Sequence, residues 1–558
     1  MLVAVSGALF LFRAGTLPLM DPDESRCAQI TDEMEKSGDL LVPHLDGEVY
    51  FDKPAPFFWL TVAARKLTGN MELSGRLVAS LAGIAAVLTT YAFGRRMFNA
   101  TAGLLGGLIL ATSVEFLFIA RWFRMDMPFT AAMWAAVWWF WRGECFFAAD
   151  GNPAHRERGW LGFYFFCAIA TLFKGPAGLV LPVLIVMVYF LLSRQTGRIK
   201  GFFNIPGIGL YLLIAAPWYV AISLREPGYA YDFFIHHNLE RYAGYSFKHH
   251  WPGIIYIPIV LAGLLPWTVY LPAVFARYFP RRWRSRAERP ELLMLWLTVI
   301  VIVVFFSFSG TKLPSYILPA IPPLAVLTGT LIAEWIEPAH PDRKMSVAAG
   351  AFTFTVLMIL LVLTGAEIWL GCIDPWIVVP AGVGGLAVWR MAEAIRRDQR
   401  RGFVVWAFGG IIIILLFVFG HTAMRGYELL SARVLARLVP PDTVAESRFC
   451  FLPNRVPSFI LYTGITKTEK LGRASSESIK RLMELMAGES RVYCFVSGTK
   501  NFEEVKKANV HPIYVLGRIA DHWLITNRPA AGNKSMSPQL QESHIAPTNL
   551  ATPDQNGR

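Results

Sequence analysis

Long apolar segments are the feature that most constrains what this chain can fold into. A transmembrane helix needs roughly 20 predominantly apolar residues, and about thirteen segments approach that length. They lie near residues 2–20, 75–93, 102–120, 128–147, 160–174, 176–193, 205–223, 253–275, 292–309, 315–335, 346–364, 375–390 and 403–421. Hydrophobic residues make up 54% of the chain and charged residues only 17%, against about 25% charged in a typical soluble domain. The sequence therefore predicts an α-helical polytopic membrane protein.

Basic residues gather in alternate loops between these segments. The clusters are Arg95-Arg96 and the loops 155–159, 194–200, 277–289, 342–344 and 390–401. Because Lys and Arg collect in cytoplasmic loops, we expect a cytoplasmic amino terminus and a periplasmic carboxyl-terminal part. The same bias accounts for the net charge of +13, so nucleic acid is not an expected partner.

The chain changes character after residue 421. Short apolar runs (RFCFL, SFILYTG, RVYCFV and PIYVLG) surround the helical pattern SSESIKRLMELMAG, which predicts a small α/β domain over residues 422–527. Residues 528–558 are polar without a hydrophobic pattern, which predicts disorder. Cys450 and Cys494 each lie within an apolar run, and the sequence leaves open whether they form a disulfide or stay as buried thiols.

The predicted outer loops carry most of the candidate chemistry. The first of them, residues 21–74, begins with Asp23 and Glu24, followed by Arg26. Farther along are Asp52 and Lys53. An ordinary solvated loop is the alternative, but acidic residues contribute little to topology and carboxylates at the membrane interface carry a desolvation cost. We therefore favour a functional site.

Three shorter outer segments add charged or polar groups. Asp126 lies between two apolar segments and follows Arg121 and Arg124, a pattern that also fits a paired Asp beside Arg residues at the interface. Lys174 interrupts an apolar stretch, so its ammonium must reach water, a carboxylate or a phosphate. Lys312 and Tyr316 stand at a third boundary.

The second long outer loop, residues 224–252, contains two adjacent His pairs. His236 and His237 form one pair, and His249 and His250 form the other. Together with Asp52, the first pair is a candidate site for a divalent cation, although the spacing matches no known zinc fingerprint. Surface histidines are the alternative.

Carboxylates and cations thus gather on one predicted membrane face. Carboxylates serve as general bases or as cation ligands, while Lys and Arg bind phosphate oxygens. A substrate with an apolar tail and a phosphate head would lie with its head at this level. That description fits a polyprenyl-phosphate sugar.

The order of these motifs resembles a known family. DPDESR, MEKSGDLLVPHLDGEVYFDKP, RMDMP, LFKGPAGLVLPVL and FFSFSGTKLPSYILP follow one another between residues 15 and 330. They are similar to the bacterial lipid A aminoarabinose transferases, and more broadly to the protein O-mannosyltransferase-like glycosyltransferases of the GT-C superfamily. The resemblance implies a GT-C fold over residues 1–421, with loops 21–74 and 224–252 forming the site, in the bacterial inner membrane.

The resemblance also implies a reaction and roles for residues. It implies an inverting transfer of a sugar, most closely 4-amino-4-deoxy-L-arabinose to lipid A, from undecaprenyl phosphate on the periplasmic face. The implied catalytic residues are Asp23, Glu24 and Asp126, and the implied donor-phosphate ligands are Arg26, Lys53, Lys174, Lys312 and Tyr316. Asp52, His236 and His237 are the implied metal ligands, if a divalent cation is used.

Some positions depart from the family pattern. Cys27 stands where the family usually has Tyr, Asp52 replaces the commoner Glu, and Asn238 stands where a His is expected. The acceptor stays open, because another sugar or a protein or glycan acceptor would use the same scaffold. A secondary transporter and a non-catalytic scaffold are the more distant alternatives. Transporters place ionisable groups near the midplane, whereas here the charges gather at one face.

Overall fold

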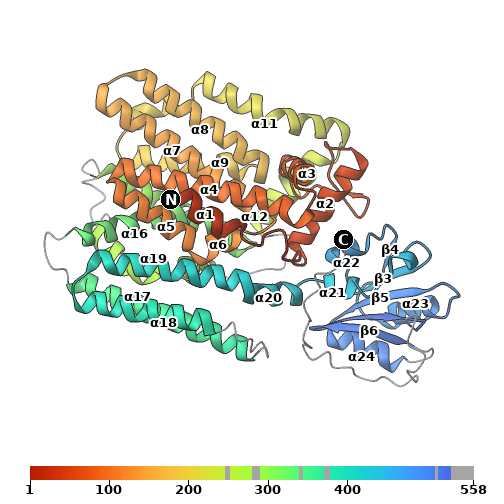
Figure 1. Cartoon of the computed structure of the whole chain (residues 1–558). Coiled ribbons are helices and arrows are strands. Elements are labelled where there is room, and N and C mark those ends of the chain that lie inside the picture. Colours follow the sequence, from red (N-terminus) through yellow and green to blue (C-terminus); the bar gives the residue numbers. More distant parts are fainter. Residues whose placement is uncertain (245–251, 280–288, 338–342, 370–377, 509–512, 530–558) are drawn as a thin grey trace. The chain divides into compact units, whose positions relative to one another are not determined.

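The computed structural model describes residues 1–244, 252–279, 289–337, 343–369, 378–508 and 513–529 (Figure 1). These residues divide into two compact units. The first contains residues 1–16, 30–366 and 374–421, and the second contains residues 17–29, 367–373 and 422–558. The first outer segment, from residue 17 to residue 29, therefore belongs to the same unit as the carboxyl-terminal part.

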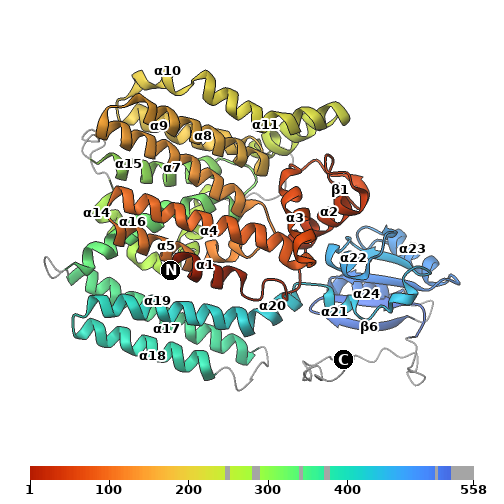
Figure 2. The same cartoon turned by 45° about the horizontal axis from the view of Figure 1, so that its top comes forward.

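The first unit is almost entirely helical (Figures 1 and 2). Its longer α-helices are α3 (Pro56–Thr68), α4 (Met71–Met97), α5 (Ala100–Thr112), α7 (Asp126–Asp150), α8 (Pro153–Lys174), α9 (Ala177–Leu192), α11 (Ile205–Arg225), α15 (Pro290–Ser307), α16 (Ile321–Ile336), α17 (Arg343–Trp369), α18 (Val378–Arg396) and α19 (Arg400–Phe417). The shorter elements are α1 (Leu2–Leu11), β1 (His44–Leu45), β2 (Glu48–Val49), α6 (Val114–Ala120), η1 (Thr196–Arg198), α10 (Ile199–Phe202), η2 (Tyr231–Glu240), α12 (Arg241–Ala243), η3 (Gly253–Ile255), α13 (Tyr256–Gly263), η4 (Trp267–Tyr270), α14 (Leu271–Tyr278) and η5 (Pro314–Ala320). α2 (Asp23–Ser37) and η7 (Val418–Thr422) each run from one unit into the other.

Fewer helices than thirteen meet the length and composition of a full span. Within the described residues, six helices are long and apolar enough to cross a membrane, or up to eight if each of two bent pairs counts as one span. The segment predicted over 2–20 is a helix only as far as Leu11, and a turn with Arg13 at φ +57° follows it. The apolar pattern alone could not show this turn.

The two bent pairs are joined at their breaks. α5 and α6 meet at 68° beside Ser113, and the segments Gly253–Gly263 and Trp267–Tyr278 meet at 107°. The Val114 amide donates to the Leu265 carbonyl at 3.1 Å, and the Trp267 indole Nε1 donates to Thr112 Oγ1 at 2.9 Å. The segments predicted as single spans over 102–120 and 253–275 are therefore broken helices. Their freed backbone groups bond to each other, as burial in a bilayer demands.

The second unit contains a five-stranded mixed sheet. Its strands are β3 (Arg448–Leu452), β4 (Thr468–Lys470), β5 (Val492–Ser497), β6 (Tyr514–Ile519) and β7 (His522–Thr526), in the order β4-β3-β5-β7-β6. Its helices are α20 (Ala423–Leu429), α21 (Arg433–Ala436), α22 (Pro457–Thr463), α23 (Ser476–Met486) and α24 (Thr499–Lys507), with a short η8 (Pro441–Thr443). Apolar clusters cover both faces of the sheet, which explains why β3 and β5 read as continuous apolar runs.

Two sequence expectations for this unit can be compared with the structure. The helix predicted from SSESIKRLMELMAG is α23, capped by Ser475. The run SFILYTG is helix α22 and not a strand: Pro457 starts it and Gly464, at φ +70°, ends it, as Pro and Gly commonly do. Cys450 and Cys494 lie opposite each other in the β3–β5 pairing and are free thiols. The tail predicted to be disordered lies, from residue 530 on, outside the described residues.

Candidate active site

The antiparallel pair α7 and α8 brings Asp126 and Lys174 together (Figure 1). Asp126 is the first residue of α7 and Lys174 the last of α8, positions that favour an acid and a base respectively because of the helix dipole. Lys174 Nζ donates to Asp126 Oδ1 at 2.6 Å, and Arg124 Nε lies 3.1 Å from Oδ2. Asp126 is 1% exposed. A buried carboxylate thus holds two cations at fixed positions.

A second carboxylate, that of Asp52, contacts another group of polar side chains. Lys53 Nζ donates to Asp52 Oδ1 at 3.0 Å, and Arg241 Nη1 donates to the same oxygen at 3.2 Å. His237 Nδ1 lies 3.4 Å from that oxygen, while the Tyr50 hydroxyl donates to Oδ2 at 3.2 Å. Asp52 lies just before α3, whereas His237 and Arg241 come from η2 and α12. The loops 21–74 and 224–252 therefore meet at Asp52.

The pKa values in this cluster follow from burial and charge. Burial alone would raise the pKa of the Asp52 carboxyl, but the positive charges of Lys53 and Arg241 outweigh it and hold that pKa well below its usual range. Burial lowers the pKa of His237 more than Asp52 raises it. At neutral pH Asp52 is ionised and His237 is neutral.

The two carboxylate clusters border one cavity of about 370 Å³. Lys53, Lys174, Arg241 and Tyr316 line it from separate segments of the chain. The Lys174 Nζ lies 4.9 Å from the centre of the Tyr316 ring, within cation–π range. The remaining lining is largely apolar and comes from Pro176, Ala177, Val180, Phe234, His237, Asn238, Leu239, Tyr242, Phe305, Phe306 and Ser309. The cavity therefore combines a cationic end with apolar walls.

An apolar cavity of about 530 Å³ lies between α8, α9 and α11. Its lining is Tyr164, Leu179, Val180, Val183, Leu184, Met187, Phe203, Ile208, Tyr211 and Leu212. Val180 lines both cavities. Both cavities therefore border α9.

Other predicted site residues lie differently. Lys312 Nζ donates to the Ser309 carbonyl at 2.6 Å, and the lining of the cavity at Lys53, taken over the described residues, does not include Lys312. His236 pairs with Glu240 at 2.9 Å. Within the described ranges no group of three His, Cys, Asp or Glu side chains could hold a metal ion, and Asp52 is bound to cations. His249 and His250 lie outside the described residues.

Asp23, Glu24 and Arg26 belong to the second unit and begin helix α2. Glu24 is fully buried and its Oε2 accepts a bond from the Met20 amide at 3.0 Å. Nearby, Asp21 accepts a bond from the Ser458 amide at 3.0 Å and a further one from the Ser458 hydroxyl. Burial raises the pKa of Asp21, against these bonds. Hydrogen bonds to Asp21 thus join the start of the first outer loop to α22.

Two cations of the site carried no assigned role in the sequence prediction. Arg124 enters that prediction only as a neighbour of Asp126, and Arg241 does not enter it. Arg241 reaches Asp52 because the ten-residue π-helix η2 leads directly into α12, and π-helical turns are frequent at functional sites. Its only sequence signal is a basic residue close to a run of aromatic and His residues.

Comparisons with known proteins agree with this architecture. Residues 52–220 match the family model for dolichyl-phosphate-mannose-protein mannosyltransferase. The matched segment includes Asp52, Lys53, Asp126 and Lys174, and the resemblance predicted from the sequence is confirmed.

Curated relatives and solved structures extend the comparison. An undecaprenyl phosphate-α-4-amino-4-deoxy-L-arabinose arabinosyl transferase from Pseudomonas fluorescens is 31% identical over 346 residues, which are 60% of this chain and 56% of that protein. The Aeromonas salmonicida protein of the same name is 31% identical over 351 residues, 62% of each chain. This chain thus spans less than two thirds of these relatives. The crystal structure of ArnT from Cupriavidus metallidurans bound to undecaprenyl phosphate matches 94% of this chain and 97% of that one, with a TM-score of 0.75 and 22% identity. The chain therefore shares the fold of this ArnT structure.

Proposed function

We propose that this protein is an integral membrane glycosyltransferase that uses an undecaprenyl-phosphate sugar as donor. The favoured transfer is of 4-amino-4-deoxy-L-arabinose to lipid A on the periplasmic face of the bacterial inner membrane. The observation that carries the proposal is the cavity between Asp52 and Asp126, with its cationic end and apolar walls. The names of the relatives with about 30% identity support the donor and the sugar.

The charge of the cavity suits a phosphate. Four cations (Lys53, Arg124, Lys174 and Arg241) surround two carboxylates, so positive charge is in excess. Phosphate oxygens accept charge-assisted hydrogen bonds from Lys and Arg. The bordering apolar cavity beside α9 suits a polyprenyl chain. No soluble sugar nucleotide would require that apolar surface.

The reaction needs little beyond positioning and charge. An acceptor oxygen attacks the anomeric carbon of the sugar, the bond from that carbon to the phosphate oxygen breaks, and undecaprenyl phosphate leaves. Lys53, Lys174 and Arg241 stabilise the negative charge that develops on the leaving phosphate. Asp52 and Asp126 act as positioning residues, because each is already bonded to the cations that it places.

Asp23 is the candidate catalytic base or acid. If the acceptor is a lipid A phosphate, its oxygen is already anionic and no proton is transferred. If the acceptor is a hydroxyl, Asp23 takes the proton as the new bond forms. Arg26 is a further candidate ligand of the donor phosphate.

The topology belongs to the same proposal. We infer a cytoplasmic amino terminus and a periplasmic unit after residue 422 from the distribution of basic loops. About thirteen membrane segments follow if the two bent pairs, the short helices α1 and α9, and the helices α7, α8 and α18 enter the bilayer beside the six long spans. A reporter fused after residue 529 should be periplasmic; a cytoplasmic reporter would contradict the orientation.

A second candidate is transfer of another sugar to a protein hydroxyl. The match of residues 52–220 to a protein mannosyltransferase model favours it. The donor cavity would be the same, so the acceptor separates the two candidates. A transporter is disfavoured because the buried ion pairs at Asp126 are fixed at helix ends.

The test is transfer by the purified protein. Wild type and Asp23→Asn are incubated with undecaprenyl-phosphate aminoarabinose and lipid A, and the masses of the products are measured by mass spectrometry. We expect wild type alone to add one aminopentose to lipid A. Sugar on protein or glycan in a parallel incubation would support the second candidate. No transfer to any acceptor by a folded protein would contradict both.

A further inference from the structure

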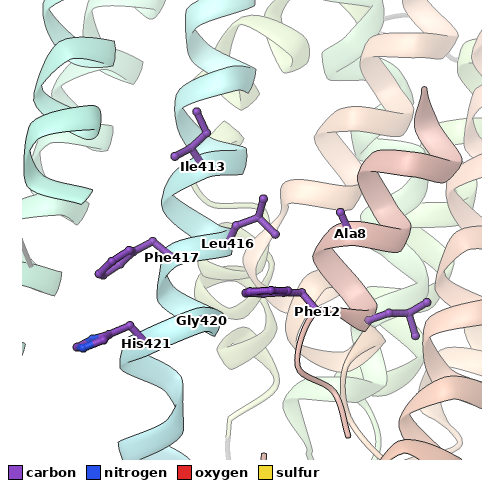
Figure 3. A pocket seen from close by; sticks show the side chains of 8 residues that line it. Ala8, Phe12, Ile413, Leu416, Phe417, Gly420 and His421 are labelled. Carbon is purple, nitrogen blue, oxygen red and sulfur yellow. The ribbon is translucent and has the colours of Figure 1, made fainter. Parts of the chain in front are cut away.

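Helices α1 and α19 border an apolar groove that the transfer reaction does not use. It has a volume of about 900 Å³ and is lined by Ala8, Leu11, Phe12, Ile413, Leu416, Phe417, Gly420 and His421 (Figure 3). Figure 3 shows Phe12 and Leu416 pointing toward each other between the two helices, while Phe417 and His421 point to the side of α19 that faces away from α1. Phe12 is 43% exposed and Ile413 is 48% exposed. Since α19 is part of a candidate span and these side chains are exposed, we expect this groove to face lipid.

One end of the groove carries positive charge. Arg13 directly follows Phe12, and its Nη1 donates to the Gly420 carbonyl. No described carboxylate pairs with Arg13. Arg121 lies behind the same end, where it bonds the carbonyls of Leu9 and Phe12 and stacks over Phe419 with its guanidinium carbon 3.8 Å from the ring centre. A cation next to an apolar groove in a bilayer attracts an anionic partner.

The backbone at this end is held in costly conformations. Arg13 has φ +57°, in the left-handed region, which costs a non-glycine residue about 1–2 kcal/mol. The end of α19 changes to the π-helical segment η7, which supplies Gly420 and His421 to the groove. The left-handed turn directs Arg13 back to this segment instead of letting α1 continue. Strain of this kind concentrates at binding sites.

We propose that the groove binds one anionic phospholipid, with an acyl chain between α1 and α19 and its phosphate on Arg13. The apolar lining fits a hydrocarbon chain, and the guanidinium fits a phosphate by charge and by paired hydrogen bonds. An uncharged lipid would leave the Arg13 charge without a partner at the membrane surface. This site is separate from the cavity at Lys53 and shares no lining residue with it.

The experiment is native mass spectrometry of the purified protein with equal amounts of phosphatidylglycerol and phosphatidylcholine. Wild type should retain one phosphatidylglycerol at least about tenfold more than phosphatidylcholine, since one charge-assisted contact is worth about a factor of ten. Arg13→Gln should lose this preference. Ala8→Phe, which fills the groove, should retain less of both lipids. The matched control Arg95→Gln changes an exposed cation outside the groove and should behave as wild type.

Circular dichroism and size exclusion establish that each variant is folded, so the readout does not depend on transferase activity. Inorganic phosphate at the same concentration should not displace the lipid; displacement would show a free-anion site instead. Equal retention of both lipids by wild type, or an unchanged preference in Arg13→Gln, would overturn the proposal.

Discussion

The two ends of helix α7 each bury a carboxylate between two cations, yet their surroundings differ. At the first residue, Asp126 lies 2.6 Å from Lys174 and 3.1 Å from Arg124. Near the last turns, Glu144 lies 2.5 Å from Arg198 and 3.5 Å from Arg156. As ion pairs they are alike, so pairing alone does not distinguish a structural group from a functional one.

The neighbours of the cations make the difference. The guanidinium of Arg156 stacks on Phe147 at 3.2 Å from the ring centre, and that of Arg198 lies 5.9 Å from it. Arg156 and Arg198 therefore each contact both Glu144 and the Phe147 ring. Lys174, in contrast, lines a cavity together with Lys53 and Arg241. Asp126 thus holds charge beside a cavity, whereas Glu144 joins α7 to α8 and η1 through Arg156 and Arg198.

The largest expected effect is a loss of sugar transfer when Asp126 is replaced. Asp126→Asn removes the charge that positions Lys174 and Arg124, and we expect transfer to fall at least about 100-fold, as when a preorganised group is lost from an active site. Glu144→Gln is the matched control, with transfer within about threefold of wild type once folded protein is counted. Initial rates of sugar transfer, measured by mass spectrometry, check both. Equal losses in the two variants would refute the distinction.

The cations of the cavity should show the next largest effect. Arg241→Ala removes one phosphate ligand, and we expect kcat/KM for the lipid donor to fall by about 10- to 100-fold, since a hydrogen bond to a charged group is worth about 1.5–3 kcal/mol. Lys312→Ala should stay within about twofold, because Lys312 bonds to Ser309. Donor titrations at fixed acceptor measure both variants. A larger loss for Lys312→Ala than for Arg241→Ala would contradict the assigned roles.

A measurement of thermal stability should separate Glu144 from an exposed ion pair. Glu144→Gln leaves two partly exposed cations with one neutral partner, and breaking a fully buried pair costs about 3–5 kcal/mol, which is an upper bound here. We expect a clear fall in Tm, measured by intrinsic fluorescence in detergent. Arg390→Gln, at an exposed pair with Glu393, should change Tm little, since such pairs contribute at most about 1 kcal/mol. A Tm for Glu144→Gln equal to wild type would remove its structural role.

The smallest expected effect is the pH dependence of the contribution that Asp52 makes to thermal stability. Because the folded pKa of Asp52 is lowered, its contribution to stability is complete above the unfolded pKa of about 3.9. That contribution is lost as the pH falls through the folded pKa. The Tm difference between wild type and Asp52→Asn should therefore stay constant from pH 8 to about pH 5 and shrink only in stronger acid. A difference that changed near pH 6.5 would point to His237 instead.

Much of the site could be predicted from residue types at the ends of apolar segments. Lys53, Asp126, Lys174 and Tyr316 were chosen because charged and polar groups at such positions need partners, and the structure brings them to one region. The fold class followed from composition and from the order of motifs. Local sequence carries this information because helix ends are where charged groups are tolerated.

Long-range pairing could not be predicted in the same way. Arg241 meets Asp52 across 189 residues, and only the π-helical turn of η2 brings it there. His236 turns to Glu240 and away from Asp52, so spacing alone suggested a metal set that the described residues do not form. The helix breaks at Ser113 and near Pro266 were also hidden, because an apolar run reads the same whether it is straight or bent.

The central claim is that the cavity at Lys53, Lys174 and Arg241 binds the phosphate of a polyprenyl lipid. The most direct measurement is the Tm shift of the purified protein on titration with undecaprenyl phosphate or undecaprenol, for wild type, Arg241→Ala and the matched control Arg198→Ala. We predict that undecaprenyl phosphate stabilises wild type and Arg198→Ala far more than undecaprenol does, and that Arg241→Ala loses most of this difference. Equal stabilisation by both lipids, or a full phosphate effect in Arg241→Ala, would contradict the claim.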